Sequence, residues 1–141
     1  MGQVISATNR FSGASKCYRF LSSARELLDE ARLYAARGEQ GLAFESAYRA
    51  ALRTAGARVA MSKKMGARKR LPSSAWDQLA LVDDAGKQRA AHFSTFSQRR
   101  SRVAAGIEDD PSAQFVQGLR RDVEDFLVEV EAEAGWVEMA A

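Results

Sequence analysis

Small apolar residues recur every four positions along the segment 41–60. These residues are Ala43, Ala47, Ala51 and Ala55. Because positions i and i+4 of a helix lie on one face, the four alanines form a narrow strip against which a second helix can pack closely. Apolar residues elsewhere in the chain also follow helical spacing, and no segment alternates apolar and polar residues as a strand would. The sequence therefore predicts an all-α fold, a single-domain antiparallel bundle of about five helices.

Residues that favour helix ends mark the first two helices. Ser23 followed by Glu26 forms a capping box, in which the hydroxyl and the carboxylate satisfy unpaired backbone N–H groups. Gly38 provides a C-terminal stop for this first helix. A second helix is expected over residues 41–60, and the short connection between the two predicts an antiparallel hairpin.

Two further helices are expected after a solvent-facing connection over residues 62–73. Ser74 begins a short helix, with Asp77 in the position that closes a capping box. Asp83 or Asp84 begins a longer helix, which is expected to continue as far as Gly106.

The last helix has the clearest end signals. Asp110 is a favourable N-cap, and Pro111 occupies the first helical position, where its missing N–H costs nothing. Gly135 ends the helix, and Trp136 and Val137 are expected to fold back over its last turn.

Length and composition are those of one globular domain. The chain has 141 residues, of which 46% are hydrophobic and 28% charged. The bundle is expected to occupy residues 21–137, between a mobile N-terminal segment of residues 1–20 and a tail of residues 138–141. No apolar run reaches the roughly 20 residues of a membrane span, and no secretory signal is recognised. The expected location is therefore the cytoplasm, with no membrane partner.

Charge is divided unevenly along the chain. Residues 1–106 contain nineteen Lys or Arg and eight Asp or Glu, a net charge of +11. Residues 107–141 contain two Lys or Arg and ten Asp or Glu, a net charge of −8. This division indicates either a basic surface that meets an anionic partner or two parts of one fold that attract each other. The acidic residues of the last helix lie largely off its apolar stripe, so a solvated face explains them better than a metal site.

Basic residues gather at two places. The first cluster is Arg58, Lys63, Lys64, Arg68, Lys69 and Arg70. The second cluster is Arg99, Arg100 and Arg102. Each phosphate that such residues neutralise releases counterions, which favours binding to RNA, DNA or a nucleotide. No aromatic residues stand among them to stack bases, and no known nucleic-acid-binding motif is present. Solvated charge, or docking to an acidic protein surface, explains the same residues.

Three stretches resemble the HEPN superfamily of small helical bundles, and more specifically an actinobacterial branch of it. The stretches are residues 45–53, residues 74–79 with the later 99–106, and residues 119–127. The first is an alanine-rich helix with an aromatic residue and repeated arginines, and the resemblance extends over roughly residues 21 to 135. It implies a HEPN-like helical bundle.

The resemblance implies several different activities. Many HEPN proteins are metal-independent ribonucleases that use an arginine and a histidine four to six residues later. In these enzymes the histidine moves a proton from the attacking 2′-hydroxyl, and the arginine holds the phosphate as charge builds on it. Other HEPN proteins bind nucleotides, and others are inactive scaffolds or toxin–antitoxin partners that dimerise along the bundle.

The ribonuclease pattern is degraded in this chain. His92 is the only histidine, and Lys87 stands where the family has an arginine. Arg89 is an arginine but precedes His92 by only three positions. Lysine offers a point charge rather than the planar fork of a guanidinium, so the exchange is not neutral for phosphate binding. Since His92 lies between Ala91 and Phe93, a partly buried structural histidine is the preferred interpretation.

The sequence therefore favours a non-enzymatic HEPN-like protein that binds nucleic acid or a nucleotide through the two basic clusters. Neither a cofactor nor a metal is expected. A metal-independent ribonuclease is one alternative, and a protein-interaction or toxin–antitoxin-like module, such as a homodimer, is another.

Overall fold

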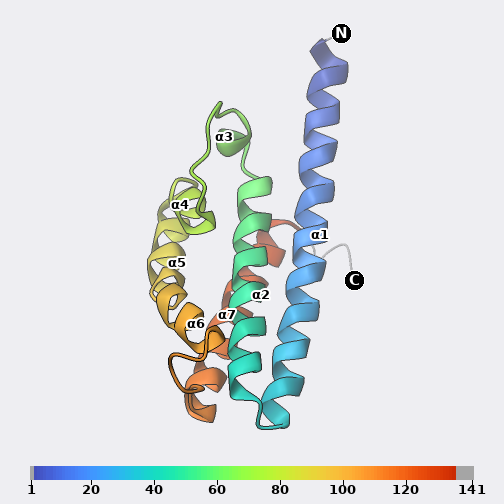
Figure 1. The fold of residues 1–141 in the computed structure, drawn as a ribbon. Helices are drawn as coiled ribbons and strands as arrows, with labels where there is room; N and C mark the ends of the chain where they lie inside the picture. Colours follow the sequence, from blue (N-terminus) through green and yellow to red (C-terminus); the bar gives the residue numbers. More distant parts are fainter. Residues whose placement is uncertain (1, 136–141) are drawn as a thin grey trace.

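Helices α1 and α2 form a long antiparallel hairpin against which the rest of the chain packs (Figure 1). The computed structural model describes the backbone of residues 2–135 and the side chains of residues 13–135. Every regular element within residues 2–135 is a helix, so the predicted all-α bundle is confirmed. The helices are α1 (Gly2–Ala36), α2 (Gln40–Ala60), α3 (Lys63–Gly66), α4 (Ala75–Ala80), α5 (Asp84–Ser94), α6 (Ser97–Ala104) and α7 (Ala113–Glu133).

Small residues allow α1 and α2 to approach closely. The four alanines of the strip predicted in α2 are all completely buried. Gly56 of α2 faces the ring of Phe20 on α1, where a Cβ would lie only 3.1 Å from a ring carbon. A Cβ on Gly13 would likewise lie 3.1 Å from the carbonyl oxygen of Ala60. The contact between α1 and α2 therefore depends on Gly13 and Gly56 remaining small.

The remaining helices cover the hairpin. Helix α7 packs against both α1 and α2, whereas α4, α5 and α6 follow one another along α2 (Figure 1). The buried apolar residues of α7 are Val116, Leu119, Val123, Phe126, Leu127 and Val130. They recur at three- and four-residue intervals, which gives α7 one continuous apolar face.

An aromatic stack joins four of the helices. The ring of Phe93 on α5 lies between Trp76 of α4 and Phe126 of α7, with centroid distances of 5.7 and 5.4 Å. The indole Nε1 of Trp76 donates a hydrogen bond to the hydroxyl of Tyr48 on α2, at 2.9 Å. This bond satisfies two polar groups that the core would otherwise leave unpaired.

The N-caps predicted for α4 and α5 are confirmed, but that of α7 is not. Ser74 accepts a hydrogen bond from the backbone N–H of Asp77, and Asp83 accepts one from Gly86. Helix α7 begins after Ser112, whose Oγ accepts from the N–H of Phe115 at 3.1 Å. Asp110 and Pro111 were the predicted start and lie outside the helix. Ser112 satisfies the free N–H in their place.

Helix α1 begins much earlier than the capping box at Ser23 predicts. It is continuous from Gly2, so residues 13–20, assigned from the sequence to a mobile start, belong to the helix. Cys17 and Leu21 are buried, which shows that the apolar face of α1 begins before Ser23. Packing of that face outweighs the modest helix propensity of a serine-rich sequence.

The single helix predicted from Asp83 or Asp84 to Gly106 is broken in two. Helix α5 ends at Ser94, and α6 begins at Ser97. Near the break, Thr95 Oγ1 donates to the carbonyl oxygen of His92 at 2.7 Å. Side-chain bonds of this kind compete with the helical ladder, which the sequence pattern did not reveal. Phe96 lies at the turn and packs edge-on against Phe115 of α7.

The predicted fold-back of Trp136 and Val137 and the predicted tail at residues 138–141 lie outside the described residues. Gly135, the last described residue, follows α7 with a positive φ of 72°. In the part of the chain that the structure describes, none of the helices combines the length and the apolar character needed to cross a membrane.

We expect Gly86→Ala to destabilise the fold. A Cβ at this position would lie 2.5 Å from the carbonyl oxygen of Leu79, so α4 and α5 would have to separate. Overpacking against backbone predicts a loss of about 1–3 kcal/mol in the free energy of unfolding, measured by urea denaturation. Gly118→Ala in α7 is the matched control, because a Cβ there meets nothing within 4 Å. The control should raise stability by about 0.5–1 kcal/mol, and equal effects would contradict this account.

Candidate functional site: the α3 loop and His92

The connection between α2 and α4, residues 62–73, is termed the α3 loop, and it protrudes from one end of the bundle (Figure 1). Ser62 caps α3, with its Oγ accepting a hydrogen bond from the N–H of Met65 at 3.3 Å. The side chain of Met65 is buried and fixes α3 to the bundle. At the other end of the loop, Gln78 Nε2 donates to the carbonyl oxygen of Pro72 at 2.6 Å. The loop is therefore anchored on both sides.

Five cationic side chains of the α3 loop face solvent. They are Lys63, Lys64, Arg68, Lys69 and Arg70. Within residues 13–135 none of them forms an ion pair, and their one side-chain hydrogen bond is from Arg68 Nε to the carbonyl oxygen of Arg70, at 3.3 Å. The loop contains no acidic and no aromatic residue. It carries a net charge of +5 that nothing in the described part neutralises directly.

Arg58 does not belong to this exposed cluster, although it is near in sequence. Its side chain is only 18% exposed and binds two carboxylates, those of Asp83 at 2.9 Å and Glu133 at 2.7 Å. The N–H of Gly86 and then Arg58 lower the pKa of Asp83. Burial raises the pKa of Glu133, and Arg58 opposes that rise. Arg58 therefore connects α2 to the start of α5 and the end of α7.

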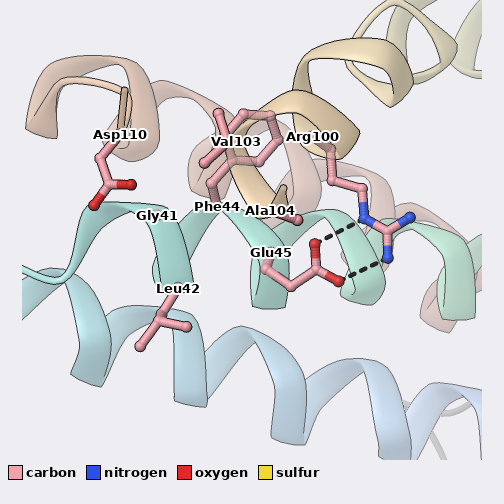
Figure 2. Close-up of a pocket in the computed structure, with 8 residues that line it drawn as sticks. All are labelled: Gly41, Leu42, Phe44, Glu45, Arg100, Val103, Ala104 and Asp110. Carbon is pink, nitrogen blue, oxygen red and sulfur yellow. Dashed lines mark hydrogen bonds and ion pairs between the residues drawn. The ribbon is translucent and has the colours of Figure 1, made fainter. Parts of the chain in front are cut away.

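Each arginine of the second predicted cluster is paired with a carboxylate. Arg99 and Arg102 both bind Glu108, at 2.8 and 2.9 Å. Arg100 forms a two-pronged ion pair with Glu45 of α2, with both N···O distances 2.7 Å (Figure 2). The structure does not bring these arginines together with the α3 loop, which lies at the other end of the bundle (Figure 1).

Aromatic rings also cover these arginines. The guanidinium of Arg99 lies 4.3 Å from the centroid of Phe115, and that of Arg100 lies 5.3 Å from the centroid of Tyr48. Each guanidinium is thus held between a carboxylate and a ring, which adds a cation–π contribution to the ion pair. These side chains stabilise the attachment of α6 and present little free charge.

His92 is exposed, so the preferred interpretation of a partly buried histidine was wrong. Its side chain is 45% exposed, and Nε2 lies 2.9 Å from Oδ2 of Asp122 on α7. A carboxylate only accepts hydrogen bonds, so Nε2 carries the proton of this bond, and in the neutral form of the ring Nδ1 can accept one. The edges of Phe93 and Phe96 contact the imidazole ring. His92 is therefore accessible and held in one orientation.

The cations predicted to accompany His92 are not arranged as a phosphate clamp. Arg89 binds Glu129 of α7, with the shorter N···O distance 2.6 Å, and lies over the ring of Phe126. Lys87 is exposed, but five residues of helix turn its side chain roughly 140° away from His92. The carboxylates of Asp122 and Glu129 offset the positive charge here.

The carboxylates that bind the arginines were not predicted from the sequence. Glu131 was assigned to a solvated face, yet it is buried and pairs with Arg25 of α1 at 2.5 Å. Glu124 binds the same guanidinium at 2.8 Å. The seven-residue spacing of Glu124 and Glu131 places them on one side of α7, but their partner lies about a hundred positions earlier in the chain. No local pattern signals such a pair. In residues 13–135, no group of three or more potential ligands is placed to hold a metal ion.

We expect Arg58→Gln and Arg68→Gln to affect stability very differently. Losing Arg58 removes the shared cation of two partly exposed carboxylates; because each such pair contributes about 0–1 kcal/mol, the free energy of unfolding should fall by about 1–2 kcal/mol. Arg68 is exposed and makes one weak contact, so its replacement should change stability by less than about 0.5 kcal/mol. Urea denaturation at neutral pH measures both, and similar values would show that Arg58 is not a connecting residue.

Comparison with known proteins agrees with this fold. No curated protein and no solved structure matches the chain significantly. The SAV_6107-like HEPN family matches residues 34–131, which include the end of α1, all of α2 to α6 and nearly all of α7. The match extends over more than half of the sequence and includes both His92 and the α3 loop. The chain belongs to the SAV_6107-like HEPN family of the HEPN superfamily.

Proposed function

We propose that the protein binds the phosphate backbone of nucleic acid, without sequence preference, through the α3 loop. The observation that carries this proposal is the contrast between two groups of cations. The arginines of α6 and Arg58 are occupied by carboxylates, whereas the five cations of the α3 loop are free of them. Because both ends of the loop are anchored, these charges are presented together on one protruding segment.

Electrostatics would supply most of the affinity. Each phosphate that a lysine or arginine neutralises releases condensed counterions, so the logarithm of the affinity falls with the logarithm of salt concentration by about 0.9 per contact on duplex DNA. Five loop cations allow up to five such contacts. Binding should therefore be tight at low salt and weak at physiological salt.

The loop has no feature that would read bases. Residues 62–73 contain no aromatic side chain for stacking, and α3 is a single turn, too short to enter a major groove as a recognition helix. Recognition through the backbone alone is the remaining mode. Membership of the HEPN superfamily is in keeping with a role related to RNA or nucleotides.

Replacing three loop cations tests the proposal. The triple variant Lys64→Gln, Arg68→Gln and Arg70→Gln should bind a fluorescent RNA or DNA duplex much more weakly, and its salt slope should be smaller by about 3. Fluorescence anisotropy at several salt concentrations measures both quantities. All three side chains are exposed, so the fold should be unaffected.

A matched control separates the loop from net charge. Arg32, Arg49 and Arg53 are exposed cations on α1 and α2, and their replacement by glutamine changes the net charge by the same amount. The control variant should keep a salt slope close to that of the unmodified protein. If both triple variants lose affinity equally, or if binding does not depend on salt, the α3 loop is not the site.

A second candidate function is metal-independent RNA cleavage at His92. The observation that favours it is the accessible imidazole, which a hydrogen bond to Asp122 holds in place. In this mechanism Nδ1 would take the proton of a 2′-hydroxyl, whose oxygen attacks the adjacent phosphate and forms a 2′,3′-cyclic phosphate, while the bond to the 5′-oxygen breaks and that oxygen takes a proton from water. Arg89 would hold the phosphate only after releasing Glu129. That requirement makes cleavage the weaker proposal.

Substitution of His92 tests the second candidate. With a chelator present, RNA cleavage that ends in a 2′,3′-cyclic phosphate should fall by about 10²–10⁴-fold in His92→Ala, because general base catalysis is lost. Gln88→Ala is the control, since Gln88 is an exposed neighbour one helical turn away. Mass spectrometry of the products identifies the cyclic end. Equal cleavage by the unmodified protein and His92→Ala would eliminate this mechanism.

A further inference from the structure

A groove lies between the start of α2 and α6, at the end of the bundle opposite the α3 loop (Figures 1 and 2). Its volume is about 280 Å³. The side chains of Leu42, Phe44, Val103 and Ala104 line it and make most of its surface apolar. Leu42 is 50% exposed, although it is a large apolar residue. The groove therefore offers apolar surface that the fold itself does not cover.

The two polar ends of this groove differ. At one end, the carboxylate of Glu45 and the guanidinium of Arg100 pair with each other through two hydrogen bonds (Figure 2). At the other end lies the carboxylate of Asp110, which makes no hydrogen bond or ion pair within residues 13–135. A Cβ on Gly41 would overlap this carboxylate, so the absence of a side chain at Gly41 leaves room for it. One end of the groove thus has an unpaired negative charge.

Further acidic and apolar residues lie near the groove in the chain. Asp109 precedes Asp110 and Glu39 lies two positions before Gly41; both are exposed acidic residues, and Ile107 is 77% exposed. An occupant that suits this site would place a large apolar side chain against Leu42 and a cation against Asp110. A segment with an exposed leucine beside an arginine has this chemistry.

The chain contains such a segment. Leu71 is 46% exposed and follows Arg70 in the α3 loop. The hydrogen bond from Gln78 to Pro72 anchors the loop directly after Leu71, so the two side chains are presented by a fixed backbone. The α3 loop and the groove lie at opposite ends of the molecule, so the loop of one copy cannot reach its own groove (Figure 1).

We propose that the groove binds the α3 loop of a second copy of this chain, with Leu71 against the apolar wall and Arg70 paired with Asp110. The contact is head-to-tail, so a dimer formed in this way keeps one unoccupied loop and one unoccupied groove. Further copies can bind to both. It joins a loop of net charge +5 to an end that has free carboxylates, and salt should weaken it. The proposal does not require that the loop binds nucleic acid. If it does, nucleic acid and the neighbouring groove compete for one loop.

Complementation between two defective variants tests the contact. Asp110→Lys should disable the groove, and Leu71→Ser should disable the loop while keeping all five cations. Sedimentation velocity at increasing concentration, up to about 1 mM, should show the unmodified protein associating progressively and each variant remaining monomeric. An equimolar mixture of the two variants should form a 1:1 dimer and nothing larger, because one copy supplies the loop and the other supplies the groove.

Three outcomes would overturn the proposal: an unmodified protein that stays monomeric, variants that associate as it does, or a mixture that stays monomeric. Circular dichroism checks that each variant is folded, and Asp110→Asn and Leu71→Ala replace any variant that is not. Leu71→Ser also separates the two proposals. This variant should keep nucleic-acid binding, because all five cations remain, and should lose self-association. Failure of one proposal is therefore distinguishable from failure of the other.

Discussion

The close contact between α1 and α2 determines where every other element can pack. Gly13 and Gly56 allow the two long helices to approach, because a Cβ at either position would lie 3.1 Å from an atom of the facing helix. Both helices also supply large buried side chains to the core, such as Leu21 of α1 and Phe44 of α2, which pack with those of α7 and the aromatic stack. A bulky residue in the buried alanine strip of α2 would displace the helices that pack against it.

Arginine residues connect the helices once the apolar core is formed. Arg25 links α1 to α7, Arg58 links α2 to α5 and α7, Arg89 links α5 to α7, and Arg100 links α6 to α2. The acidic end of the sequence therefore serves in large part as the partner of the basic remainder. Among the charges that remain without an ion pair in residues 13–135 are the cations of the α3 loop at one end of the bundle and Asp110 at the other.

The sequence was sufficient to predict features that depend on local spacing. The all-α fold, the α1–α2 hairpin and the caps at Ser74 and Asp83 are of this kind. The exposure of His92 could not be predicted, because it follows from contacts between residues far apart in the chain. The break before α6 was missed for another reason: the local bond from Thr95 to the carbonyl of His92 leaves no signal in the spacing of apolar residues. The same limit applies to the basic clusters. Position in the sequence grouped Arg58 with the loop lysines, whereas only the tertiary structure shows which cations have a carboxylate partner.

Helix α6 is held to the bundle in an unusual way. It has no buried residue, and its contacts are the ion pairs of three arginines, the rings beneath two of them, and a partly buried Val103. Ions in solution screen such pairs, whereas they leave the alanine contacts of the hairpin intact. Salt should therefore weaken the attachment of α6, which forms one side of the groove, before it weakens the apolar contact between α1 and α2.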